Sequence, residues 1–159
     1  MKAISAALVA TVLALTAQAA SAEHLYTSWK GPGQSLDIYN GGKYNNYAHL
    51  APTGNFSGQA WTITPSGSWY RLTTAFRGPD MCLDVVNGGS MNNFVHLTPC
   101  GNYTGQFWHL TPAADGSFRM TTQFRGPDMC LDIVNGGSEN FMAHLVKCGE
   151  FSGQFWHKG

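Results

Sequence analysis

The sequence predicts an all-β, barrel-like fold, and three observations carry that prediction. The chain of 159 residues holds 19 glycines and is 13% aromatic, a composition that favours short strands and tight turns. Apolar residues alternate over short stretches, and no stretch has the length and periodicity of an amphipathic helix. Above all, one unit of about 47 residues occurs three times, which indicates a fold built from repeats.

Two copies of the unit are closely similar. Residues 78–109 and 126–157 match at 22 of 32 positions, and residues 31–62 form a third, more diverged copy. The tryptophans near the ends of the copies, Trp61, Trp108 and Trp156, are 47 and 48 residues apart. We place the repeats at about 23–69, 70–117 and 118–159, so that together they form one domain over residues 23–159.

Each repeat is expected to contain four short strands. In the third repeat these are residues 121–124, 129–134, 141–148 and 154–157. The second of them alternates, with Asp132 on the face opposite Leu131. Asn135-Gly136-Gly137 then predicts a turn, because Asn and Gly tolerate positive φ. Three units of four strands are too few for a propeller with blades of this length, but they can close as a three-fold barrel.

The N-terminus has the layout of a secretory signal peptide. Lys2 gives a positive start, residues 3–16 form an apolar run, and Ala20-Ser21-Ala22 is a small-residue cleavage site. A membrane anchor is the less favoured interpretation, because the run is short for a bilayer. We therefore expect residues 1–22 to be removed and the remaining chain to be secreted, without a membrane span.

The charge balance limits the possible partners. Nine basic and nine acidic residues cancel, and only 11% of the chain is charged. Such a chain lacks the basic face that a phosphate backbone requires, so no nucleic-acid partner is expected. Neutral polar ligands are the first candidates for a partner, and we expect a monomer without a cofactor.

The repeat selects a pairing for the four cysteines. Four cysteines permit three pairings, and a secreted chain favours disulfides. The first repeat has Ser35 and Thr53 at the two equivalent positions, so both cysteines are absent there together. This favours bridges within repeats, Cys82–Cys100 and Cys130–Cys148. Zinc is the less favoured interpretation, since no two cysteines are closely spaced, and no metal site is expected.

Two motifs recur at the same place in every repeat. A Leu-Asp pair, preceded by Cys or Ser, lies on the second expected strand, and a Gln-x-Trp motif lies near the end. Three such units resemble the ricin B-chain type lectins, or R-type lectins. The resemblance implies a β-trefoil of three four-stranded repeats with pseudo-three-fold symmetry. It also implies a structural core role for Gln59, Trp61, Gln106, Trp108, Gln154 and Trp156.

The resemblance implies a secreted lectin that binds glycans without catalysis, through up to three shallow pockets, one per repeat. It maps the ligand-binding carboxylate onto Asp37, Asp84 and Asp132. A carboxylate suits this role because its two oxygens can accept hydrogen bonds from neighbouring sugar hydroxyls. The polar residue of the third strand maps onto His49, His96 and His144. A turn or capping role for the aspartates, and backbone hydrogen bonding for the histidines, are the structural alternatives.

Two features of the related family are missing from all three repeats. The aromatic residue two positions after the histidine is replaced by Ala51, Thr98 and Val146, and the Asn before the Gln of Gln-x-Trp by Gly58, Gly105 and Gly153. Ordinary galactose recognition is therefore not expected. A substitute stacking surface is offered in the adjoining loops by Phe56, Tyr103 and Phe151, whose structural alternative is to anchor the barrel rim. Further polar contacts are offered by Asn40, Asn87 and Asn135, for which a turn role is the favoured interpretation.

The sequence also bears on two other classes of function. A trefoil interaction protein that binds no sugar, such as a toxin delivery subunit or a hydrolase inhibitor, is the alternative to a lectin. Enzyme activity is not expected, because glycosidases need two carboxylates about 5–10 Å apart. Three aspartates related by symmetry should lie farther apart than that. We also predict that the first repeat has the weakest pocket, because it is the most diverged and lacks the cysteines.

Overall fold

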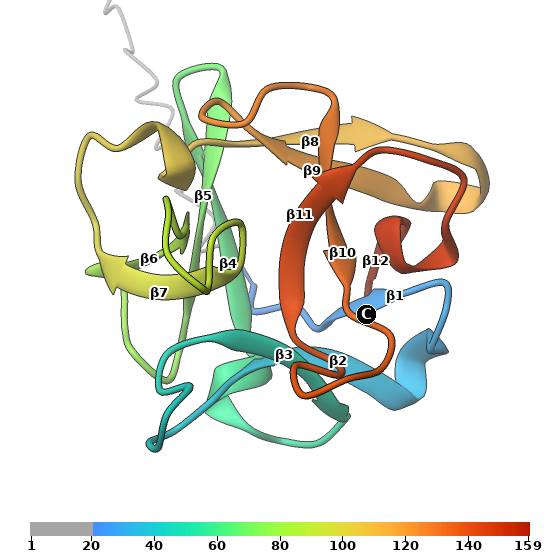
Figure 1. Cartoon of the computed structure of the whole chain (residues 1–159), viewed down its shortest axis with the longest axis horizontal. Helices are drawn as coiled ribbons and strands as arrows, with labels where there is room; N and C mark the ends of the chain where they lie inside the picture. Colours follow the sequence, from blue (N-terminus) through green and yellow to red (C-terminus); the bar gives the residue numbers. More distant parts are fainter. Residues whose placement is uncertain (1–20) are drawn as a thin grey trace, which may run out of the picture.

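A computed structural model describes residues 21–159, which form twelve short strands joined by turns (Figure 1). Most of the expected signal peptide, residues 1–20, lies outside the described residues. The strands are β1 (Leu25–Thr27), β2 (Gln34–Ile38), β3 (Ala48–Pro52), β4 (Trp61–Ser66), β5 (Trp69–Thr74), β6 (Met81–Val85), β7 (Val95–Pro99), β8 (Trp108–Pro112), β9 (Phe118–Thr122), β10 (Met129–Ile133), β11 (Ala143–Lys147) and β12 (Trp156–Lys158). Within residues 21–159, no helix is long and apolar enough to cross a membrane.

Six strands form the barrel. Their order in the sheet is β1-β12-β9-β8-β5-β4, with antiparallel pairs throughout. The two edges meet at a bridge, where the Glu23 N–H donates to Trp61 O (2.8 Å) and the Trp61 N–H donates to Glu23 O (2.9 Å). Closure leaves no long free edge, which removes a template for aggregation.

The other six strands form three hairpins, β2–β3, β6–β7 and β10–β11. Backbone hydrogen bonds join each hairpin to the next repeat around a ring: Leu50 N–H to Phe141 O, Leu97 N–H to Asn46 O and Leu145 N–H to Asn93 O, at 2.8, 2.9 and 2.8 Å. A six-stranded barrel with three such hairpins is a β-trefoil, and Figure 1 shows the hairpins gathered around the middle of the molecule. The predicted fold class is confirmed.

The core is built from the same positions of each repeat. Trp61, Trp108 and Trp156 have no exposed surface. Each indole N–H donates to the carbonyl of the leucine before the repeated aspartate, Leu36 O (2.7 Å), Leu83 O (2.9 Å) or Leu131 O (2.9 Å). Each tryptophan therefore fills the core and also holds a barrel strand against a hairpin strand of its own repeat.

All four strands of the third repeat have boundaries that differ from the sequence prediction. Strand β10 ends at Ile133 and β11 spans Ala143–Lys147, one or two residues short of the predicted ends. The first strand runs over Phe118–Thr122, so Gln123 and Phe124 lie in the turn that follows it. The last strand begins at Trp156, because residues Ser152–Gln154 form a 3₁₀ turn. The side chain of Gln154 is buried and hydrogen-bonded, and local strand propensity does not reveal that these bonds require a turn here.

Both predicted disulfides are present. Cys82–Cys100 and Cys130–Cys148 each join the start of one hairpin strand to the residue after its partner, with Cα atoms 5.0 Å apart. In the first repeat the same two positions form a hydrogen bond, Ser35 Oγ to Thr53 Oγ1 at 2.7 Å. The three hairpins are therefore tied at the same place by two kinds of link.

Because the Ser35 and Thr53 side chains meet, we predict that the double variant Ser35→Cys/Thr53→Cys forms a third disulfide. An 18-residue loop should add about 3 kcal/mol in the chain-entropy model. Thiol titration of the denatured, non-reduced variant should find no free thiol, and the melting temperature should rise. The single variant Ser35→Cys is the control, and free thiols in the double variant would contradict the prediction.

Candidate functional site

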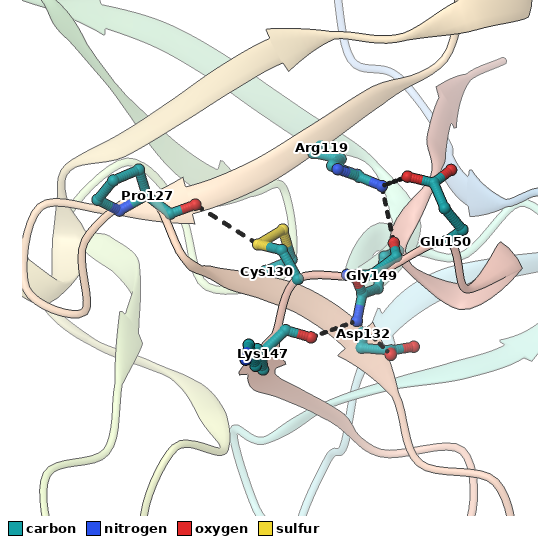
Figure 2. A network of polar contacts seen from close by, with 9 residues as sticks. Arg119, Pro127, Cys130, Asp132, Lys147, Gly149 and Glu150 are labelled. Atoms are coloured by element: carbon teal, nitrogen blue, oxygen red, sulfur yellow. Dashed lines mark hydrogen bonds and ion pairs between the residues drawn. A yellow bond between two sulfur atoms is a disulfide. The ribbon is translucent and has the colours of Figure 1, made fainter.

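The repeated aspartates lie on β2, β6 and β10, the first strand of each hairpin. Each is partly exposed, and two hydrogen bonds fix its carboxylate. In the third repeat the Ile133 N–H donates to Asp132 Oδ1 (2.7 Å), and Gln154 Nε2 donates to Asp132 Oδ2 (2.9 Å). Figure 2 shows Asp132 in this network, with Lys147 and Gly149 beside it. Each carboxylate oxygen accepts one bond from the protein and keeps a lone pair for a further donor.

The buried amide of Gln154 organises this network. Its Nε2 also donates to Lys147 O (3.1 Å), and its Oε1 accepts a hydrogen bond from the Gly149 N–H (2.9 Å). The side chain has no exposed surface, so these bonds satisfy polar groups that have no access to water. One side chain thus links the aspartate, the end of strand β11 and the loop that follows it.

The other repeats reproduce the arrangement. Gln59 Nε2 donates to Asp37 Oδ2 at 3.0 Å, and Gln106 Nε2 donates to Asp84 Oδ2 at 3.1 Å. In both repeats the Oδ1 atom accepts the N–H of the next residue at 2.7 Å. The three carboxylates are therefore held in the same way in all three repeats.

The glycine before each of these glutamines makes room for the carboxylate. A Cβ atom built on Gly153 would collide with Asp132 Oδ1, and one on Gly58 or Gly105 would collide with Asp37 or Asp84. These glycines stand where the related family has Asn. An asparagine would not fit at these positions, because the backbone lies too close to the aspartate to leave room for a Cβ atom.

Two aspartates open into surface cavities. Asp132, Asn135, Phe151 and Trp29 line a cavity of about 340 Å³, and its other lining residues are Ile133, Glu150, Ser152 and Gly153. The cavity of the second repeat, about 360 Å³, is lined by Asp84, Val85, Asn87, Asn102, Tyr103, Thr104, Gly105 and Phe124. Aspartate, asparagine and loop aromatic, three of the residue sets predicted from the sequence, come together in both repeats.

The loop aromatics are the large apolar side chains most exposed to solvent in the described chain. Phe56, Tyr103 and Phe151 are 59%, 61% and 61% exposed. Each ring lies over a glycine two residues earlier, since a Cβ on Gly54, Gly101 or Gly149 would meet it. Each ring thus rests on its own backbone and turns its remaining surface to solvent.

Arginines hold two of these loops in place. Arg119 on β9 donates to Gly149 O (2.7 Å) and pairs with Glu150 (2.8 Å), as Figure 2 shows. Arg71 on β5 donates to Gly101 O (2.7 Å). The equivalent position in the first repeat is His24, so the loop of Phe56 lacks this arginine.

One residue of each cavity comes from the following repeat, which the sequence reasoning did not assign to the site. Trp29 precedes β2 but lines the cavity of Asp132, and Phe124 precedes β10 but lines that of Asp84. The available signal was the recurrence of an aromatic at Trp29, Phe76 and Phe124, just before each repeated Gly-Pro. A linear repeat boundary had separated these residues from the sites that they complete.

The repeated histidines lie on the partner strands of the aspartate hairpins. His49, His96 and His144 stand directly opposite Asp37, Asp84 and Asp132 in the hairpin registers. The rings of His96 and His144 pack near Tyr47 and Phe94 of the preceding repeat, and the ring of His49 stacks on Tyr39. Neither His96 nor His144 lines the cavity beside its aspartate. Burial lowers the pKa of all three imidazoles, and the aspartate opposite offsets part of that shift.

Residues 21–159 contain no group of three or more His, Cys, Asp or Glu side chains that could hold a metal ion. The four cysteines are all engaged in the two disulfides.

Comparisons with known proteins add a family. The family model described as a ricin-type β-trefoil lectin domain matches residues 68–159. No curated protein matches the chain significantly.

Solved structures show the same fold at low identity. A designed three-fold symmetric protein, ThreeFoil, is 19% identical with a TM-score of 0.71, and the match covers 86% of this chain and 96% of that one. A mosquitocidal holotoxin is 15% identical with a TM-score of 0.74, over 87% of this chain and 17% of the toxin. A GlcNAcα1-4Gal-releasing endo-β-galactosidase from Clostridium perfringens is 13% identical with a TM-score of 0.68, over 87% of this chain and 32% of the enzyme. The chain thus spans a small part of the two larger proteins.

The glycine before Gln154 gives a first test of the network. We predict that Gly153→Ala destabilises the fold by about 1–3 kcal/mol, because the added methyl displaces Asp132 Oδ1 and weakens the bond to a buried amide. Urea unfolding measures the effect. Gly33→Ala is the matched control, since Gly33 also lies in a 3₁₀ turn and has open space around its Cα. Equal stabilities would contradict this account of the glycine.

The histidines predict how stability depends on pH. Since burial lowers their pKa in the folded state, the unfolded chain binds protons more readily, and stability falls as the pH drops below about 6.5. Melting temperatures between pH 7.5 and 5.5 should therefore decline. His96→Gln should flatten the decline, whereas His109→Gln, at an exposed position, should leave it unchanged. A slope that His96→Gln does not alter would refute the assignment.

Proposed function

Because the chain belongs to the family of ricin-type β-trefoil lectin domains, we propose that it is a secreted protein that binds glycans without catalysis. Its ligand sites are the cavities beside Asp84 and Asp132, and a weaker site lies beside Asp37. The observation that carries the proposal is the recurrence in two cavities of a fixed carboxylate, an exposed asparagine and an exposed aromatic ring.

The carboxylate accounts for the recognition of hydroxyl groups. Asp132 is oriented by Ile133 and Gln154 before any ligand arrives, so binding costs little side-chain entropy. The remaining lone pairs of Oδ1 and Oδ2 can accept hydrogen bonds from hydroxyl groups, and the negative charge of the carboxylate disfavours an anionic ligand. The amide of Asn135, on the turn after β10, can both donate to and accept from further hydroxyls.

The loop aromatic accounts for the apolar face of a sugar. Tyr103 and Phe151 supply flat surfaces against which the C–H groups of a pyranose ring can pack. These rings take the place of the aromatic that is missing from β7 and β11, where the chain has Thr98 and Val146. The change of position supports specificity for a glycan other than simple galactosides.

The repeated histidines and two arginines have supporting roles in this proposal. His96 and His144 lie opposite the carboxylates in the hairpin registers and outside the two cavities, so in this proposal they support the aspartates and do not contact the glycan. Arg71 and Arg119 hold the loops of Tyr103 and Phe151 to the barrel, and the first repeat has no such arginine. This difference supports the prediction that the site beside Asp37 is the weakest.

A glycan array with the protein lacking residues 1–22 tests the proposal. We expect binding to neutral glycans and a loss of about tenfold or more in affinity when Tyr103→Ala and Phe151→Ala are combined, since each site loses its stacking surface. Both rings are more than half exposed, so their removal should leave the melting temperature nearly unchanged.

The matched control is Thr64→Ala, on the exposed face of β4. Thr64 lines a separate hollow together with Arg71 and the Cys82–Cys100 bridge, so its replacement should not alter glycan affinity. Replacing Asp132 by Ala is less decisive, because it also strips the buried Gln154 amide of a partner. A protein that binds no glycan but captures a protein partner would overturn the proposal in favour of an interaction protein.

A further inference from the structure

The aromatic residue that each site receives from the next repeat is fixed by the backbone. The Trp29 N–H donates to Ser152 O (3.1 Å), the Phe76 N–H to Ser57 O (3.1 Å) and the Phe124 N–H to Thr104 O (3.2 Å). In each case the acceptor directly follows the exposed loop aromatic. The two aromatic residues of a site therefore belong to segments that are hydrogen-bonded to each other, although they come from different repeats.

In the third repeat these two residues stand around one carboxylate. Trp29, Phe151 and Asp132 line the same cavity. Phe151 is supported from below by Gly149, and Trp29 is partly buried against the core. An aromatic surface from each of two segments and a hydrogen-bond acceptor from a third are thus presented to the same space.

The indole of Trp29 is held in its orientation by two neighbours. Lys30 Nζ lies 4.0 Å from the centroid of the indole and 4.9 Å from that of Phe141. The Phe141 ring itself lies 6.0 Å from the indole at an angle of 41°. In the other repeats an arginine covers a phenylalanine instead, Arg77 over Phe76 and Arg125 over Phe124, both at 4.1 Å. The site of the third repeat is the one that receives an indole.

We propose that Trp29 is a specificity-determining residue of the site beside Asp132, where it packs against the sugar opposite Phe151. This inference rests on the proposed function and names the class of ligand more closely. A pyranose gripped between two aromatic surfaces must present an apolar C–H surface on both sides and carry its hydroxyls at the edge, toward Asp132 and Asn135. Equatorially substituted neutral sugars meet this requirement. The larger surface of an indole makes this the tightest of the three sites.

The five tryptophans make the proposal measurable. Trp61, Trp108 and Trp156 have no exposed surface, and Trp69 lies on the β4–β5 hairpin with its ring 6.1 Å from that of His109. Of the five tryptophans, only Trp29 lines the cavity of Asp132. Ligand binding at this site should therefore shift the intrinsic fluorescence and protect it from acrylamide quenching, through Trp29 alone.

The probes are chitotriose, cellotriose and N-acetyllactosamine, added singly to the protein and to its variants. We expect at least one to change the fluorescence, with the change lost in Trp29→Phe and kept in Trp69→Phe. Affinity measured by calorimetry should fall about threefold in Trp29→Phe and about tenfold in Trp29→Ala. If Trp29→Ala fails to fold, Trp29→Phe, which reproduces the residue of the other repeats, carries the test.

The outcomes separate this inference from the proposed function. Binding on the array, with unchanged affinity and fluorescence response in Trp29→Phe, overturns the role of Trp29 and leaves the lectin proposal standing. A probe that binds equally well after Phe151→Ala but not after Trp29→Phe overturns the two-sided grip. A protein that binds neither the array nor any probe overturns both proposals.

Discussion

The buried glutamine amide is the interaction on which the rest of the structure depends. In each repeat it satisfies a carbonyl at the end of one hairpin strand, an N–H in the following loop and a carboxylate on the other hairpin strand. Loss of any partner would leave a polar group without water, at a cost of about 1–3 kcal/mol. The same bonds hold the fold together and orient the aspartate, so the stability of the fold and the proposed recognition of glycans depend on the same residues.

Symmetry fixes the framework, and small differences give the three sites unequal properties. The aspartate and glutamine recur with nearly identical distances, while the residues at the rim vary. The loop before β12 has Arg119 paired with Glu150, and the equivalent loop of the first repeat has neither residue. The residues at the rim can therefore differ between repeats, and with them the affinity of each site, without disturbing the barrel.

Much of this organisation could be predicted from the sequence, for identifiable reasons. The repeat reveals the three-fold plan, the joint absence of two cysteines reveals the bridges, and alternation around Asp132 reveals the hairpin strands. The 3₁₀ turn at Gln154 could not be predicted, because it is imposed by the buried bonds of its own side chain. The recurrence of an aromatic at Trp29, Phe76 and Phe124 is visible in the sequence, but the assignment of Trp29 to the site of Asp132 depends on how the first repeat meets the third.

The pairing of β1 with β12 bears on how the molecule assembles. Leu25 lies opposite Lys158, so β1 can pair with β12 only after every other strand of the barrel has been made. Until then the barrel stays open between β1 and β12. Contacts of such long range slow folding, because a large loop must close before they form. Trp29 lies two residues after β1, so the pairing of β1 with β12 is coupled to the completion of the cavity beside Asp132.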